Sequence, residues 1–225
     1  MEMKLRFLEL REKYRQFYNA VYQHHRTAER PHQGHGMDHD VTVAQLCLRI
    51  SPNEHIEKLA WLAGILHSTD RTVERGNTGK VAELVEGFIQ LLPDSVSSYV
   101  RALIHDAVMR HAEMNRDDQT LVQQVLMDAD RLANLQAAVI MRCGQHYSKV
   151  PALELEWLGE MNPNSTYNEP CSVLDDVRGN VKGYMPQFRL QKAIKLAEFY
   201  KERNEKYVIE VQGDYRMLGL HDIEL

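Results

Sequence analysis

The stretch LVQQVLMDADRLAN, residues 121–134, carries two acids, Asp128 and Asp130, through the middle of an apolar run. A helical period places Asp130 on one face with four apolar residues, Val122, Leu126, Ala133 and Ala137. An ionised carboxylate withdrawn from water is tolerated only when it is paired with a cation, protonated or bound to a metal ion. Arg131 is a poor partner, because adjacent helical residues point about 100° apart. We therefore expect the partner of Asp130 to come from elsewhere in the chain.

Helical periodicity extends over most of the chain, and no segment shows the alternation that is typical of strands. We predict helices at about 5–26, 39–50, 54–68, 81–92, 95–111, 118–143 and 187–215. Loops are expected at 29–38, with Asp38 as the N-cap of the next helix, and at 68–80. Residues 147–185 are rich in turn-forming residues and predict a loop-rich insert with one short helix at about 153–160. The predicted fold is an all-α, single-domain helical bundle over residues 1–225, closed by the helix at 187–215.

The composition is ordinary for a soluble globular protein, with 26% charged and 44% hydrophobic residues and a net charge of −5. This acidic excess argues against a nucleic acid as the main partner. Three widely spaced cysteines indicate a reducing compartment rather than a disulfide framework. The N-terminus is too charged for a signal peptide, and no apolar run approaches the length of a membrane span. We expect a cytoplasmic protein with no membrane partner, and the sequence leaves its oligomeric state open, a homo-oligomer included.

Three stretches place an imidazole or a carboxylate on or beside an apolar helix, and they are far apart in the sequence. They are HGMDH at 35–39, LAGILHSTD at 62–70 and LMDADRL at 126–132. Imidazole and carboxylate groups that converge from several helices are good ligands for a divalent metal such as Mn, Fe, Ni, Co, Zn or Mg. A single histidine on a helix is more often a hydrogen-bonded core residue or a surface residue. The combination of all three with Asp130 favours a metal site.

The order and context of these residues resemble the HD-domain superfamily of metal-dependent phosphohydrolases. The resemblance rests on His39 in HDVTVAQ, His67 in LAGILH and Asp130 in DADRLAN, and it covers most of the chain from about 24 to 200. It is strongest to small bacterial single-domain members, which carry an extra histidine and a VK stretch that are matched here by His111 and Lys182. The resemblance implies His39, His67 and Asp130 as ligands of a divalent metal and a small phosphorylated substrate, in the first place a nucleotide.

The signature His-Asp doublet of this superfamily is broken here, because Ser68 follows His67. A serine hydroxyl is a poor ligand for a divalent ion at neutral pH and adds no negative charge. Asp70 is a candidate to compensate as a ligand and catalytic group, because residues three apart share a face if the helix continues. The alternative is that Asp70 ends the helix in solvent, as aspartates in loops commonly do.

Further residues take roles that depend on a bound metal, which would activate a water molecule for attack on phosphorus. Basic side chains near the site are candidates to bind the phosphate: Arg71, Lys80, Arg110 and Lys182. His111, or less favourably His105, would be a further ligand, a contact to phosphate or a proton donor to the leaving group. His35 is a candidate to support a ligand from behind, against the alternative of a surface residue. Asp128 would orient a ligating histidine or pair with an arginine.

Three hypotheses for function follow. The first is a metal-dependent phosphohydrolase that acts on a nucleotide or another small phosphorylated metabolite. The second is a catalytically degenerate HD-like protein that binds a nucleotide or a partner without turnover. The third, a helical scaffold with incidental histidines, leaves Asp130 on an apolar face without a reason. Metal content separates the first two hypotheses.

Overall fold

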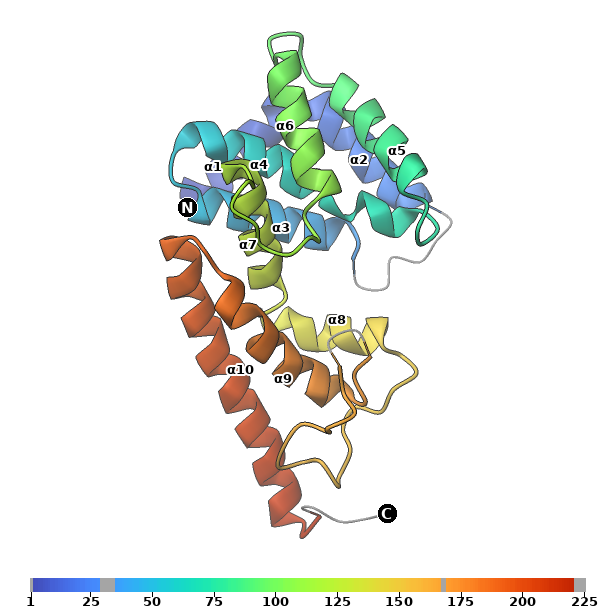
Figure 1. Cartoon of the computed structure of the whole chain (residues 1–225), viewed down its shortest axis with the longest axis vertical. Coiled ribbons are helices and arrows are strands. Elements are labelled where there is room, and N and C mark those ends of the chain that lie inside the picture. Colours follow the sequence, from blue (N-terminus) through green and yellow to red (C-terminus); the bar gives the residue numbers. More distant parts are fainter. Residues whose placement is uncertain (1, 29–34, 167–168, 221–225) are drawn as a thin grey trace. The chain divides into compact units, whose positions relative to one another are not determined.

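The structure, a computed structural model, describes residues 2–28, 35–166 and 169–220, and Figure 1 shows that they form helices joined by irregular segments, the longest of which precedes α9 (Val173–Tyr184). They form ten α-helices and two short 3₁₀ helices and contain no strand, so the predicted all-α class is confirmed. The helices are α1 Glu2–Lys13, α2 Arg15–Thr27, α3 Met37–Ile50, α4 Glu54–Leu66, η1 His67–Thr72, α5 Thr78–Gln90, α6 Ser98–Met109, α7 Leu121–Ala133, α8 Ala138–His146, α9 Val173–Tyr184, η2 Met185–Gln187 and α10 Gln191–Met217.

The chain divides into two compact units, residues 1–130 and 131–225. The boundary falls near the end of α7. The single domain predicted over residues 1–225 therefore remains a prediction. None of the helices in the described part of the chain is both long enough and apolar enough to cross a membrane.

The core of the first unit is built around the packing of α3 against α4. A Cβ atom added at Gly64 of α4 would lie 2.8 Å from the Cα of Ala44 in α3, so only glycine permits this approach. The first unit also contains large apolar side chains that are almost fully buried: Leu10, Phe17, Ile50, Trp61, Leu62, Ile65, Leu66, Ile89, Ile104, Leu126 and Met127. The close approach brings the beginning of α3 next to the end of α4, where two of the candidate histidines lie.

Several helix ends differ from the prediction for local reasons. The helix predicted at 5–26 is interrupted at Tyr14, between α1 and α2, and the one predicted at 118–143 is interrupted between α7 and α8. Asp38 is not an N-cap, because Gly36 precedes α3 and Asp38 lies in its first turn, where its charge still favours the helix dipole. The loop predicted at 68–80 is shorter, because Asn77 caps α5 by accepting a hydrogen bond from the backbone N–H of Lys80 at 3.1 Å. Residues 29–34 of the predicted loop lie outside the described residues.

The second unit contains α8, α9 and α10, and its irregular part is shorter than predicted. The described residues 147–166 and 169–172 are irregular, and no helix forms at 153–160. Ser172 then caps α9 by accepting a hydrogen bond from the N–H of Asp175 at 3.2 Å, so the predicted insert at 147–185 ends in a helix. Arg178 of α9 holds the irregular segment by donating to three of its carbonyl groups, those of Trp157, Leu158 and Glu160.

Candidate metal centre

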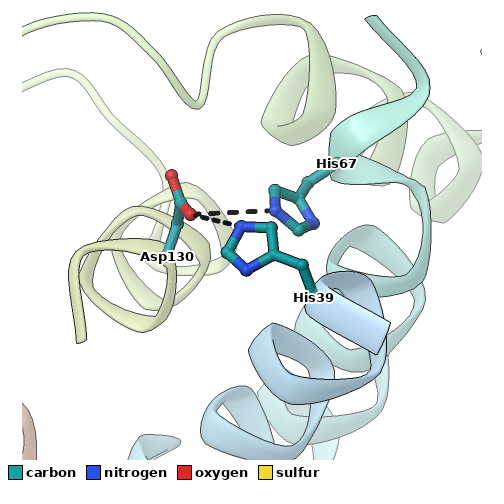
Figure 2. A group of neighbouring side chains, drawn as sticks. All are labelled: His39, His67 and Asp130. Carbon is teal, nitrogen blue, oxygen red and sulfur yellow. Dashed lines mark ion pairs between the residues drawn. The ribbon is translucent and has the colours of Figure 1, made fainter. Parts of the chain in front are cut away.

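Three of the predicted ligands converge in the first unit, as Figure 2 shows. His39 lies in the first turn of α3, His67 is the first residue after α4, and Asp130 lies in the last part of α7. His39 Nε2 is 3.2 Å and His67 Nε2 is 3.7 Å from the same oxygen, Asp130 Oδ1. The ligand atoms of all three lie within 4.8 Å of one another, which fits a group that holds one divalent ion.

The two histidines are buried, whereas the side chain of Asp130 is 25% exposed. The sequence placed Asp130 on an apolar face with Val122 and Leu126. Both of these residues are buried, whereas the carboxylate on the same face is partly exposed. Asp128, two residues earlier, is the fully buried acid of α7. The partial exposure of Asp130 leaves an approach to the site from solvent.

The orientation of the His67 ring follows from its contact with a backbone carbonyl. Nδ1 lies 2.8 Å from the carbonyl oxygen of Gly64, which can only accept a hydrogen bond, so Nδ1 carries the hydrogen. In the neutral ring the other nitrogen, Nε2, then presents a lone pair, and this is the atom that faces Asp130. An imidazole lone pair that faces a carboxylate oxygen needs a cation between them, either a proton or a metal ion. The donor set therefore fits a divalent ion.

The electrostatics of Asp130 reflect its histidine neighbours. Burial favours the neutral acid, but a hydrogen bond with His39 and the charges of His67, His39 and His111 outweigh it. Together they hold the pKa of Asp130 well below its ordinary value of 3.8. The carboxylate is therefore ionised at neutral pH and available as a ligand.

Ser68 occupies the position at which the His-Asp doublet has its aspartate. Its buried hydroxyl lies 3.2 Å from His67 Nε2 and can donate a hydrogen bond to that lone pair. Asp70 is not part of the convergent group, and one of its oxygens lies 3.5 Å from Nε of Arg71. The chain does continue as a helix through Asp70, but as the 3₁₀ helix η1 rather than as an extension of α4. The role of Asp70 as a ligand or catalytic group stays a prediction.

Two further histidines flank the three ligands. The ring of His111 is 5.6 Å from that of His67, and the ring of His35 is 5.0 Å from that of His39, between centroids. His111 Nδ1 is 2.6 Å from the carbonyl oxygen of Val108 and therefore carries a hydrogen, which leaves Nε2 as the reactive nitrogen. The predicted placement of His111 and His35 beside the ligands agrees with these distances, and neither belongs to the group of three.

The predicted phosphate-binding residues are mostly engaged with acids. Arg71 contacts Asp70, Lys80 lies 2.9 Å from Glu83, and Arg110 is hydrogen-bonded through two nitrogens to Glu113. Arg110 also has Asp106 at 3.6 Å and Asp118 at 4.0 Å. Lys182 is exposed and belongs to the second unit. Ion pairs at the surface are weak, so these contacts leave the three cations of the first unit able to exchange partners.

Two residues near the site were missed by the reasoning from sequence. Asp40 is fully buried, with Oδ1 at 3.1 Å from His67 Nδ1 and Oδ2 at 3.0 Å from Nε2 of His25, which is also buried. Asp40 directly follows His39, and an acid inside the apolar pattern of α3 is the same signal that drew attention to Asp130. His25 gives no such signal, because it follows His24 in a polar part of the chain.

Comparisons with known proteins identify the fold but no family. No family model matches the chain, and no curated protein matches it. Among solved structures, it is similar to a Lactobacillus plantarum protein whose crystal structure was determined as a structural genomics target. The TM-score is 0.69 at 17% sequence identity, and the match covers 92% of this chain and 98% of the other. At that identity the likeness shows a shared helical fold.

Proposed function

We propose that this protein is a metal-dependent phosphohydrolase that acts on a nucleotide or another small phosphorylated metabolite. The observation that carries the proposal is the meeting of His39 Nε2 and His67 Nε2 on one oxygen of Asp130. The resemblance of these three sequence contexts to the HD-domain phosphohydrolases supports the same reaction class. A divalent ion, when bound, would supply an activated water molecule and polarise a phosphoryl oxygen.

The residues of the site have separate tasks in this proposal. His39, His67 and Asp130 would hold the ion, with the Gly64 carbonyl fixing the ring of His67 through its Nδ1–H. His111 is fixed in the same way by Val108, and its Nε2 would contact the phosphate or pass a proton to the leaving group. Arg71, Lys80 and Arg110 are the cations of the first unit proposed to bind the phosphate, after exchange of their present acidic partners.

A second candidate function is the binding of a nucleotide or a partner without turnover. Two observations favour it: the neutral Ser68 beside His67, and the acidic partners that already occupy the predicted phosphate-binding cations. This candidate shares the fold and the group of three proposed ligands with the first. It differs from the first in predicting no release of phosphate.

The test combines metal analysis with an assay of phosphate release. The full-length protein, stripped with a chelator, is reloaded with Mn²⁺ or Ni²⁺ and analysed for metal by elemental analysis, then assayed against nucleotides and sugar phosphates. We expect about one ion per chain, as a single group of three ligands would hold, and phosphate release that depends on the metal. His67→Ala is expected to abolish both, whereas His55→Ala, which removes an exposed histidine of α4, leaves both unchanged.

The outcomes separate the two candidates. Metal binding without release of phosphate from any of these compounds favours the binding protein. A wild-type chain that takes up neither Mn²⁺ nor Ni²⁺, or a His67→Ala variant that binds them as tightly as the wild type, contradicts the metal site itself.

A further inference from the structure

Three buried ionisable side chains, His25, Asp40 and His67, form a row that ends at the candidate metal centre. Asp40 lies between His25 and His67, with one carboxylate oxygen toward each ring, at 3.0 Å and 3.1 Å. Their exposed fractions are 3%, 0% and 2% for His25, Asp40 and His67. A carboxylate removed from water in this way requires an opposing partial or full positive charge, and here an imidazole stands on each side.

Asp40 and the ion-binding side chains reach the same ring from opposite edges. Nδ1 of His67 faces Asp40 Oδ1 and the Gly64 carbonyl, whereas Nε2 faces Asp130. His39 and Asp40 are adjacent in α3 and therefore point about 100° apart, one to each side of His67. Because Gly64 lets α3 approach α4 closely, α3 supplies two neighbours of the His67 ring. His39 lies near its Nε2 side with Asp130, and Asp40 lies near its Nδ1.

We propose that Asp40 is a positioning residue of this site, which supplies through His67 the negative charge that Ser68 does not provide. This inference rests on the proposed function, in which His67 is a metal ligand. Asp130 is the one acid within the convergent group of described residues, so two imidazoles and one carboxylate leave a divalent ion with one unbalanced positive charge. A negative charge beside Nδ1–H, whose hydrogen the Gly64 carbonyl accepts, makes Nε2 a stronger donor to the ion.

The low polarity of the surroundings makes this effect substantial. Charges in a protein interior interact much more strongly than in water, and Asp40 is fully buried. The Gly64 carbonyl already fixes the orientation of the ring, so the contribution of Asp40 is its charge rather than its shape. Changing the acid to an amide of the same size therefore isolates the effect.

The experiment measures Mn²⁺ and Ni²⁺ affinity of the full chain by titration calorimetry, with Asp40→Asn compared with Asp176→Asn. Asp176 is a buried acid of the second unit, 7% exposed and hydrogen-bonded, and is a matched control for placing an amide in the interior. We expect Asp40→Asn to weaken binding by about 10- to 100-fold, the usual loss when an acid behind a ligating histidine is removed. Asp176→Asn is expected to leave the affinity unchanged.

A rescue experiment separates the charge of Asp40 from a general structural role. Ser68→Asp places a carboxylate on the opposite side of His67, so in the Asp40→Asn background it is expected to recover most of the lost affinity. The gain is expected to be larger in that background than in the wild type, because the two charges substitute for one another. Equal gains in both backgrounds, or an Asp40→Asn variant with wild-type affinity, overturn the inference.

A measurement on the wild-type chain covers the case in which Asp40→Asn does not fold. The ¹³Cγ chemical shift of Asp40 at pH 7 reports whether its carboxyl group is ionised, which the proposal requires. A protonated Asp40 overturns the inference regardless of the variants. Wild-type protein that binds no metal contradicts the proposed function, whereas metal binding that is indifferent to Asp40 contradicts this inference alone.

Discussion

Asp130 in the first unit and Asp176 in the second are two acids on helices that are largely withdrawn from water, and their surroundings act on them in opposite directions. Asp130 is surrounded by His39, His67 and His111, which hold its pKa well below 3.8 against the effect of burial. Burial raises the pKa of Asp176, and its hydrogen bonds from Cys143 and Asn180 offset that effect only in part. Burial thus disfavours the charge in both places, and the neighbouring groups decide the result.

The partners of Asp176 show what a structural acid looks like in this protein. Cys143 of α8 donates from Sγ to Asp176 Oδ2 of α9 at 2.6 Å, and Asn180 donates to the same oxygen at 3.1 Å. Burial, together with the nearby Asp176, raises the pKa of the Cys143 thiol, so the thiol remains protonated and serves as a donor. This contact joins two helices and needs no ion.

The partners of Asp130 differ in kind, because each imidazole is able to direct a lone pair at the carboxylate. His67 must do so when it is neutral, since its other nitrogen donates to the Gly64 carbonyl. A thiol and an amide bring their own hydrogens to an acid, whereas an imidazole can bring either a hydrogen, as in the bond from His39, or a lone pair that a metal ion can share. The difference between the two clusters is the reason for proposing a metal at one of them alone.

The comparison is tested most strongly by removing the two negative charges in parallel. Asp130→Asn is expected to weaken Mn²⁺ or Ni²⁺ binding by at least about 100-fold, because it removes the charged ligand itself and not only a supporting group. Asp176→Asn is expected to change the affinity less than about twofold, because Asp176 is bonded to Cys143 and Asn180 of its own unit and not to any of the three proposed ligands. Titration calorimetry on the chelator-treated variants measures both. Equal losses in the two variants would show that the structural distinction drawn between these acids is mistaken.

The sequence predicted the convergence of His39, His67 and Asp130 because each lies at a position that a helical pattern makes visible. The close approach of Gly64 to Ala44 then brings the helices that carry the two histidines together. An acid within an apolar helix pointed to Asp130. Asp40 is likewise an acid within an apolar helix, α3. Its two partners, His25 and His67, come from other helices, and no spacing along the chain indicates them.

The remaining differences arise where short-range signals compete. The continuation of α4 as a 3₁₀ helix from His67 depends on how the chain packs, and the residue types alone do not distinguish it from a loop. α9 was missed because the prolines and asparagines before it dominate the segment 147–172, although Ser172 provides a capping signal and the apolar Leu174 and Val177 follow it. Tertiary contacts, such as those of Arg178 with three carbonyl groups, hold the irregular part together.

Helix packing gives a second contrast between the two units, with a smaller expected effect. Gly64→Ala in α4 would place its Cβ 2.8 Å from the Ala44 backbone, and we expect it to lower the free energy of unfolding by about 1–3 kcal/mol. Gly144 in α8 has no atom within 4 Å of an added Cβ, so Gly144→Ala is expected to raise it by about 0.5–1 kcal/mol through helix propensity. Urea denaturation of both variants measures the difference. A Gly64→Ala variant with the same free energy of unfolding as the wild type would mean that α3 can move away from α4 without loss of stability.

The smallest expected effect is on the pH dependence of stability, where the two acids should give opposite signs. The pKa of Asp130 is lower in the folded chain than in the unfolded chain, so its contribution to stability is present above the unfolded value of 3.8 and is lost as the pH falls through the folded pKa. The pKa of Asp176 is higher in the folded chain, so its contribution is present below 3.8 and is lost as the pH rises through the folded pKa.

Urea denaturation of metal-free wild type, Asp130→Asn and Asp176→Asn over this acidic range measures both contributions as differences from the wild type. The stability of the wild type relative to Asp130→Asn is expected to rise with pH across the window just below 3.8, whereas its stability relative to Asp176→Asn is expected to fall across the window just above 3.8. Two differences of the same sign would mean that the imidazoles around Asp130 do not stabilise its charge in the absence of metal. The site would then depend on the ion itself to keep this carboxylate ionised, because the protein would provide no other compensating charge.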